Sequence, residues 1–132
     1  MRISRSTGYA LLAVGYVAQN KVGKVILSQD ISKKYDIPLE YLLKILQRLV
    51  RANVLHSKRG PHGGFSLARS ANKITVLQII EAVDGPMVNH LSLVEQTQRS
   101  KFSVRADKVY NKAISQARTV FENTKLSSLL TK

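Results

Sequence analysis

The sequence predicts a mainly α-helical protein with one small β-hairpin, arranged as a winged helix-turn-helix followed by a long C-terminal helix. Two helical segments are separated only by the helix-breaking turn Asp36-Ile37-Pro38. Directly after the second of them, a glycine-rich tip over residues 60–64 joins two short strand-like segments. Beyond residue 100, apolar residues recur at nearly heptad spacing.

The chain is strongly basic. Its 132 residues include 21 Lys and Arg against 8 Asp and Glu, so its net charge is +13. Such a charge on a small domain indicates a polyanionic partner, with nucleic acid ahead of a membrane surface. The hydrophobic content of 44% is enough to build a core. Because the sequence has no cysteine, disulfides and thiolate-held metal sites or iron–sulfur clusters are excluded.

The first helix is expected to start near Ser6 or Thr7, whose hydroxyl can cap it, and to end within residues 20–23. Its apolar stretch, residues 9–18, follows two arginines, as in a secretory signal. Ten residues are too few for a membrane helix, and a buried central helix needs the same composition. We therefore expect a cytoplasmic protein, with a cleaved signal as the alternative.

Two further helices follow, separated by the tight turn. Ser28 is expected to cap a short helix over residues 29–35, and the next helix runs from Pro38 to about Ala52. Apolar residues three and four positions apart form one buried stripe on this second helix: Leu42, Ile45, Leu46 and Leu49. The polar residues that lie largely off the stripe are Glu40, Lys44, Gln47, Arg48 and Arg51. A helix of this kind can lie in the major groove of DNA.

The hairpin after these helices has the position of a wing. Residues 54–59 and 65–69 are expected to be its strands. Between Glu40 and Glu81 the sequence contains no acidic residue, although it contains seven Lys and Arg. The expected groove helix and wing therefore occupy a stretch in which no carboxylate would repel phosphate.

The last part of the chain contains two more helices. Thr75 and Gln78 form a capping-box pattern that opens a helix ending at Asp84-Gly85-Pro86. Residues 87–99 show no firm periodicity. The long helix beyond them has too broad an apolar face to be stable alone, so it must pack on the first helix, on a copy of itself, or on both. The expected dimer interface consists of Phe102, Ala106, Val109, Tyr110, Ala113, Ile114, Ala117, Val120 and Phe121. We expect a DNA-binding domain over residues 1–86, and a linker with a dimerisation helix over residues 87–132.

Three segments together resemble the Rrf-two (Rrf2) family of bacterial transcription regulators. They are residues 2–11 (RISRSTGYAL), residues 37–49 and, most specifically, the wing motif KRGPHGGFSLA of residues 58–68 followed by Ile74-Thr75. The resemblance covers residues 1–85 well and is fainter in the long helix and in residues 125–130. It implies a winged-helix homodimer that pairs through the long C-terminal helix and binds a palindromic operator.

The chain departs from this family at two places. Many relatives carry three cysteines before the long helix that bind an iron–sulfur cluster, whereas this chain has Ser, Thr, Gln and His90 in that region. The resemblance therefore does not bring the cluster with it. Several cluster-binding relatives also have Glu-Gln where this chain has Leu43-Lys44, which implies a different operator preference.

The residues expected to contact DNA come from both helices and the wing. Arg59 leads because an arginine at a wing tip can enter a narrow minor groove. Glu40 can accept from a cytosine amino group, or act only at the start of its helix. The full set is Ser28, Gln29, Pro38, Leu39, Glu40, Lys44, Gln47, Arg48, Arg51, Lys58, Arg59 and His62.

The sequence thus predicts a sequence-specific transcription regulator, with repression as the expected mode, that binds double-stranded DNA as a homodimer. No catalytic motif is present, and His56, His62 and His90 are not completed by a carboxylate cluster. We therefore expect no enzyme activity, no metal and no cofactor, and no membrane partner. A small-molecule effector in the linker region is left open. The alternatives are a basic RNA-binding or ribosome-associated protein and a pure interaction module, because net charge does not identify the polyanion.

Overall fold

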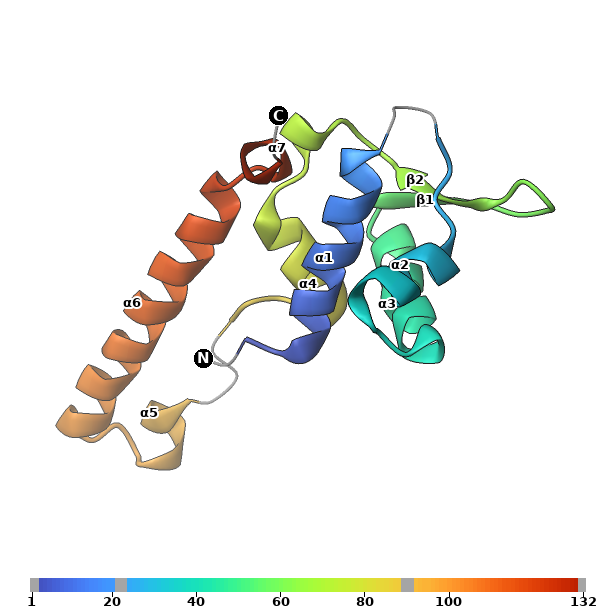
Figure 1. Ribbon diagram of the computed structural model, residues 1–132. Helices are drawn as coiled ribbons and strands as arrows, with labels where there is room; N and C mark the ends of the chain where they lie inside the picture. The colour runs from blue at the N-terminus through green and yellow to red at the C-terminus, as the bar shows by residue number, and fades with distance from the viewer. Residues whose placement is uncertain (1–2, 21–23, 89–91, 131–132) are drawn as a thin grey trace.

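The computed structural model describes residues 3–20, 24–88 and 92–130 (Figure 1). It is mostly helical, with one two-stranded antiparallel sheet, which confirms the predicted fold class. The elements, in chain order, are α1 (Arg5–Gln19), α2 (Ser28–Tyr35), α3 (Leu39–Arg51), β1 (Leu55–Lys58), β2 (Gly64–Leu67), the 3-10 helix η1 (Ala71–Lys73), α4 (Val76–Asp84), α5 (Leu93–Gln96), α6 (Lys101–Asn123) and α7 (Leu126–Leu129).

The apolar stretch of α1 forms the centre of the hydrophobic core. Ala10, Ala13, Val14 and Val17 are all buried, and α1 packs against α3, α4 and β2. The stripe predicted on α3 faces the same core, with Leu42, Ile45, Leu46 and Leu49 buried. The composition of residues 9–18 is therefore that of a core helix.

Two predicted helix starts differ from the structure by one or two residues. The first helix begins at Arg5, and the cap is Ser4, whose hydroxyl accepts from the Thr7 N–H. Thr7 lies one turn further along the helix, and its own hydroxyl donates to the Ser4 carbonyl at 2.8 Å. Ser28 is already part of α2, whose cap position is Leu27 without a side-chain hydrogen bond. In both places, the residue predicted to cap the helix lies inside it: Ser6 or Thr7 in α1, and Ser28 in α2.

The wing is shorter than predicted and is tied to the body by an additional strand contact. Its register pairs Leu55 with Leu67 and Lys58 with Gly64. Ile26 bridges to Phe65 on the other edge of β2, with both backbone hydrogen bonds at 2.8 Å. A Cβ on Gly64, which has φ +151°, would lie 2.6 Å from the Ile26 carbonyl oxygen. Glycine is required there because the chain before α2 passes so close to the strand.

The segment after α6 returns to the N-terminal part of the molecule. Leu126 is 2% exposed within the hydrophobic core. Its N–H donates to the Ile74 carbonyl at 2.8 Å, and the Val76 N–H donates to the Thr124 carbonyl at 2.9 Å. The chain therefore closes on the start of α4, where the predicted capping box of Thr75 and Gln78 is present.

The long helix was expected to pack on the first helix, on a copy of itself, or on both. Its main partners within the chain are α4 and α5, so the first helix is not among its main contacts. The short helix α5 lies in the segment where no element was predicted. The Asp107 carboxylate on α6 holds its start, because it accepts from the N–H groups of Leu93 at 3.2 Å and Val94 at 3.0 Å. Within the described residues, no helix combines the length and apolar character needed to cross a bilayer.

Candidate nucleic-acid interface

The turn between α2 and α3 is fixed by local hydrogen bonds. Asp36 adopts the left-handed conformation that ends α2. The Ile37 N–H donates to the Ser32 carbonyl at 3.1 Å, and the Ser32 hydroxyl donates to the Ile37 carbonyl at 2.6 Å. Ile37 itself is buried in the core. The local hydrogen bonds and this buried side chain together fix the angle between α2 and α3.

One row of exposed side chains runs along the outer face of α3. Glu40, Lys44, Gln47 and Arg51 are all exposed, and spacings of four, three and four residues place them on one face of a helix. This row lies opposite the buried stripe and carries donors and acceptors that can contact base edges or phosphates. The structure thus brings together four of the five polar residues predicted for this helix.

Arg48 is the member of that helix that points elsewhere. Its Nη1 donates to the Val83 carbonyl at the end of α4, at 2.9 Å. A cation at a helix C-terminus satisfies a free carbonyl and interacts favourably with the helix dipole. Its guanidinium is therefore engaged in holding α3 against α4, a role that spacing along α3 does not reveal.

The residues predicted at the starts of α2 and α3 differ in accessibility. Gln29, Pro38 and Leu39 are exposed. Ser28 is 9% exposed, and its hydroxyl donates to the Gln29 side chain at 3.3 Å. Gln29 is therefore the accessible polar side chain at the start of α2, and Ser28 positions it.

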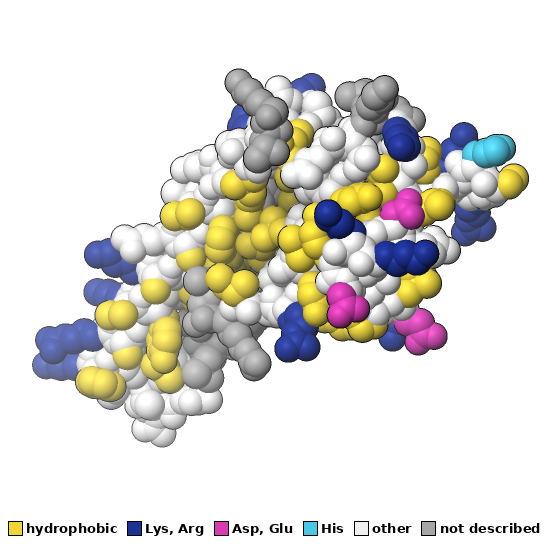
Figure 2. Space-filling view, in the orientation of Figure 1, with side chains coloured by type: hydrophobic (Ala, Val, Ile, Leu, Met, Phe, Trp, Pro, Cys, Tyr) yellow, Lys and Arg dark blue, Asp and Glu magenta, His cyan; other side chains and the backbone are white. Residues whose placement is uncertain are grey.

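The wing extends from the body with its basic residues exposed. Lys58, Arg59 and His62 are all exposed, and Figure 1 shows the hairpin tip standing well clear of the helices. Figure 2 shows Lys or Arg side chains and a histidine on this projection. A Cβ on Gly63 would lie 2.2 Å from the Lys58 carbonyl oxygen, so the tight tip depends on glycine. The open, narrow tip can approach a groove closely.

The acid-free stretch between Glu40 and Glu81 forms α3, the wing and the start of α4. Within it, Arg69 is engaged in the fold, since its guanidinium donates to the carbonyl oxygens of Asn53 and Lys73 and to the Gln78 side chain. The wing, the α3 row and the exposed Lys73 of η1 remain as the accessible basic surface of this stretch. Its field favours a polyanion.

The predicted dimer interface divides into two faces of α6. Ala106, Ile114, Ala117 and Phe121 are half-buried. The remaining predicted residues are exposed: Phe102 (81%), Val109 (69%), Val120 (61%), Tyr110 (53%) and Ala113. A shallow groove lined by Phe102, Arg105, Ala106, Val109 and Tyr110 lies on this exposed stripe, and apolar side chains are visible along the arm in Figure 2. So large an apolar surface indicates an interaction face.

The histidines do not form a metal centre in the described part of the chain. His56 and His62 are exposed on the wing, and the described residues contain no group of three or more His, Cys, Asp and Glu side chains able to hold a metal ion. His90 lies outside the described residues.

Comparisons with known proteins agree with this geometry. Residues 3–132 match the model of a family named Rrf2, described as "Iron-dependent Transcriptional regulator". A protein of Aquifex aeolicus (strain VF5) described as an HTH-type transcriptional regulator is 32% identical over 98% of this chain and 92% of its own length. The HTH-type transcriptional regulator IscR of Cereibacter sphaeroides is 37% identical over 64% of this chain and 56% of its own length. The structure of CymR, the global cysteine regulator of B. subtilis, superposes with a TM-score of 0.78 at 23% identity, covering 98% of this chain and 95% of CymR.

Proposed function

The chain belongs to the Rrf2 family of DNA-binding transcriptional regulators, and from that premise we propose that it is a homodimeric repressor that binds a palindromic operator. The observation that carries this proposal is the exposed row of Glu40, Lys44, Gln47 and Arg51 on α3, continued by the basic wing. A protein bound through these surfaces would occupy promoter DNA and block transcription. It would act in the cytoplasm, where bacterial DNA is transcribed.

Each protomer would read one half-site in two ways. The α3 row would lie in the major groove, where Lys44 and Gln47 reach base edges or phosphates and Glu40 accepts from cytosine. Arg59 at the wing tip would enter the adjacent minor groove and respond to its width. Lys58, Arg51 and Gln29 would contribute contacts to the phosphate backbone.

A second protomer would cover the exposed stripe of α6. A twofold pair buries the same patch on both copies, so Phe102, Val109 and Val120 would each be removed from water twice. The same twofold axis would place two α3 helices on one face of the duplex. The operator would then consist of two inverted half-sites about one helical turn apart, roughly 10 base pairs.

The iron in the family description does not fit this chain. Thiolates are the usual ligands of iron–sulfur clusters, and the sequence has no cysteine. Nor do the described residues bring three His, Asp or Glu side chains together. We therefore propose that DNA binding here requires no cluster, and that any signal arrives as a different small molecule.

Binding measurements on defined nucleic acids test the proposal. Fluorescence anisotropy at one salt concentration would compare duplex DNA, duplex RNA and single strands, and selection from randomised duplexes would recover the operator. We expect preference for duplex DNA and a selected site with inverted symmetry. Tighter binding of RNA would instead favour the RNA-binding alternative, and a selected site without symmetry would contradict the twofold arrangement.

A further inference from the structure

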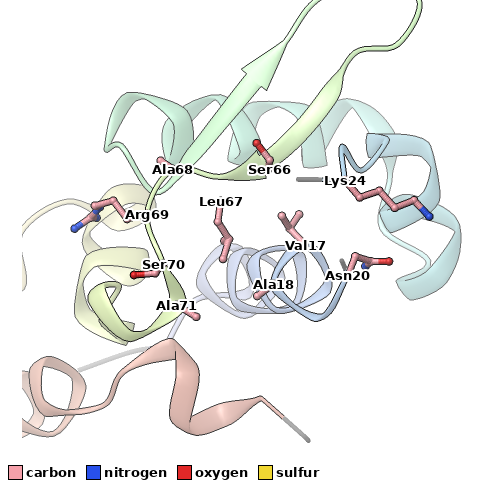
Figure 3. A pocket seen from close by; sticks show the side chains of 10 residues that line it. All are labelled: Val17, Ala18, Asn20, Lys24, Ser66, Leu67, Ala68, Arg69, Ser70 and Ala71. Carbon is pink, nitrogen blue, oxygen red and sulfur yellow. The ribbon is translucent and has the colours of Figure 1, made fainter. Parts of the chain in front are cut away.

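A cavity lies on the side of the wing strand that faces α1. Its walls come from the end of α1, from Lys24 and from the continuous segment 66–71 (Figure 3). Its volume is about 480 Å³, which is within the range of small-molecule sites in proteins. It belongs neither to the α3 row nor to the exposed stripe of α6, so DNA binding and dimerisation leave it unexplained.

The inner surface of this cavity is mainly apolar. Figure 3 shows the Leu67 side chain pointing from the strand towards α1, where Val17 and Ala18 lie, with Ala71 at the lower edge. Leu67, Ala18 and Ala71 are half-buried, whereas Val17 belongs to the core. A short hydrocarbon chain placed here would be removed from water on several sides.

On the strand edge next to the cavity, the Leu67 N–H has no hydrogen-bond partner among the described residues. Phe65 exchanges both of its backbone hydrogen bonds with Ile26. Because residues two apart on a strand point to the same edge, the Leu67 N–H and carbonyl face this edge as well and not β1. The bridge to residue 26 does not continue to residue 24, and no residue in the described part of the chain accepts a hydrogen bond from the Leu67 N–H across this edge.

The charges around the cavity favour an anion. The lining residues include Lys24 and Arg69 but no Asp or Glu. The Arg69 guanidinium is held by the Asn53 and Lys73 carbonyls and the Gln78 side chain, and Figure 3 shows it turned away at the end opposite Lys24. Figure 3 shows the exposed Lys24 side chain directed outward from the cavity. Rotation about its four-carbon stem can bring the ammonium over the mouth of the cavity.

We propose that this cavity binds a small organic anion, a carboxylate on a short apolar chain, held between the Leu67 N–H and the Lys24 ammonium. The apolar chain lies against Leu67, Ala18 and Ala71. The bound anion contacts β2, and the other end of that strand carries the wing tip with Arg59. As an effector site, which rests on the proposed function, the cavity couples carboxylate binding to the position of the wing on DNA.

Calorimetric titration of the full chain, without DNA, tests the site with sodium hexanoate as the probe and hexanamide as its uncharged counterpart. Lys24→Gln removes the ammonium, and Ala18→Leu fills the cavity. Lys108→Gln, at an exposed position on α6, is the matched control for loss of one positive charge. Thermal unfolding of each variant verifies that it is folded.

We expect hexanoate to bind at least about tenfold more tightly than hexanamide, because a charged hydrogen bond is lost with the amide. Lys24→Gln should weaken hexanoate binding about tenfold, Ala18→Leu should abolish it, and Lys108→Gln should leave it unchanged. If Ala18→Leu does not fold, the comparison of hexanoate with hexanamide and Lys24→Gln still decide the question.

The outcomes separate the site from the function. Absence of hexanoate binding to the wild-type chain, or equal binding of hexanamide, would overturn the carboxylate site whatever happens with DNA. Operator binding that is the same with and without saturating hexanoate would overturn the effector role alone. Failure to bind duplex DNA would refute the proposed function while the titration without DNA stays interpretable.

Discussion

The exposed stripe of α6 leads to a quantitative prediction about assembly. Val109 is 69% exposed, and full burial of a valine is worth about 1.5–3 kcal/mol. Covering the exposed part would therefore contribute about 1–2 kcal/mol per copy, or about 2–4 kcal/mol in a twofold dimer. Val109→Asp removes this contribution and also places two carboxylates in the interface. We expect the dimer dissociation constant to rise at least about 100-fold.

Sedimentation velocity over a range of protein concentrations measures this change. Ser115→Asp is the matched control, because it introduces the same charge at an exposed position of α6 that lies off the apolar stripe. Ala113→Asp, one turn after Val109, should act like Val109→Asp. A Val109→Asp protein that dimerises as strongly as the wild type and the control would refute the assignment of the stripe as the dimer interface.

Four further predictions concern DNA binding and stability. Arg59→Ala should lose about 1–3 kcal/mol of binding free energy on the selected operator and relax the preference for A·T-rich flanks. Lys44→Ala should alter the sequence preference inside the half-site or lower the salt slope of binding by about one per site. Binding selections at one salt concentration would contradict this if both variants behaved like the wild type. Raising salt from about 50 to 200 mM should weaken operator binding by about three to five orders of magnitude if about six to ten phosphates are neutralised; a flat anisotropy response would mean that the charge serves another purpose. Chelation and mild oxidation should leave operator affinity unchanged, because the chain has no thiolate; dependence on a stoichiometric metal would count against the proposal. Leu126→Ala should destabilise the fold by about 2–5 kcal/mol in denaturant titration, since this side chain is 2% exposed in the core; a change below about 0.5 kcal/mol, the usual size for a surface substitution, would show that the C-terminal return is not part of the stable core.

Arg48 and Arg51 offer one more comparison on the same helix. Arg51 is in the exposed row, whereas the Arg48 guanidinium holds the Val83 carbonyl. Arg51→Gln should weaken duplex binding without changing the melting temperature. Arg48→Gln should lower the melting temperature. Any loss of DNA affinity in this variant should come from a displacement of α3, and not from a lost contact to DNA. If both variants lost the same DNA affinity and kept the same melting temperature, the different roles assigned to Arg48 and Arg51 would be contradicted.

Local patterns determined much of this protein. The stripe of Leu42, Ile45, Leu46 and Leu49 fixed which face of α3 is buried, because helix geometry alone sets that spacing. The sequence also predicted the capping box at Thr75, because its two hydrogen bonds join residues only three positions apart. The wing was predicted from its glycines, although its strands proved shorter than expected.

Contacts between distant segments were decided only by the tertiary structure. The bridge from Ile26 to Phe65, the bond from Arg48 to Val83 and the return of Leu126 to the core join residues 35 or more positions apart. Every residue has a backbone carbonyl, and a strand of any sequence has edges that can pair. The pattern of side chains therefore does not predict which carbonyl or which edge is used. The cavity beside Leu67 has the same origin, because it exists only where the end of α1 meets the wing strand.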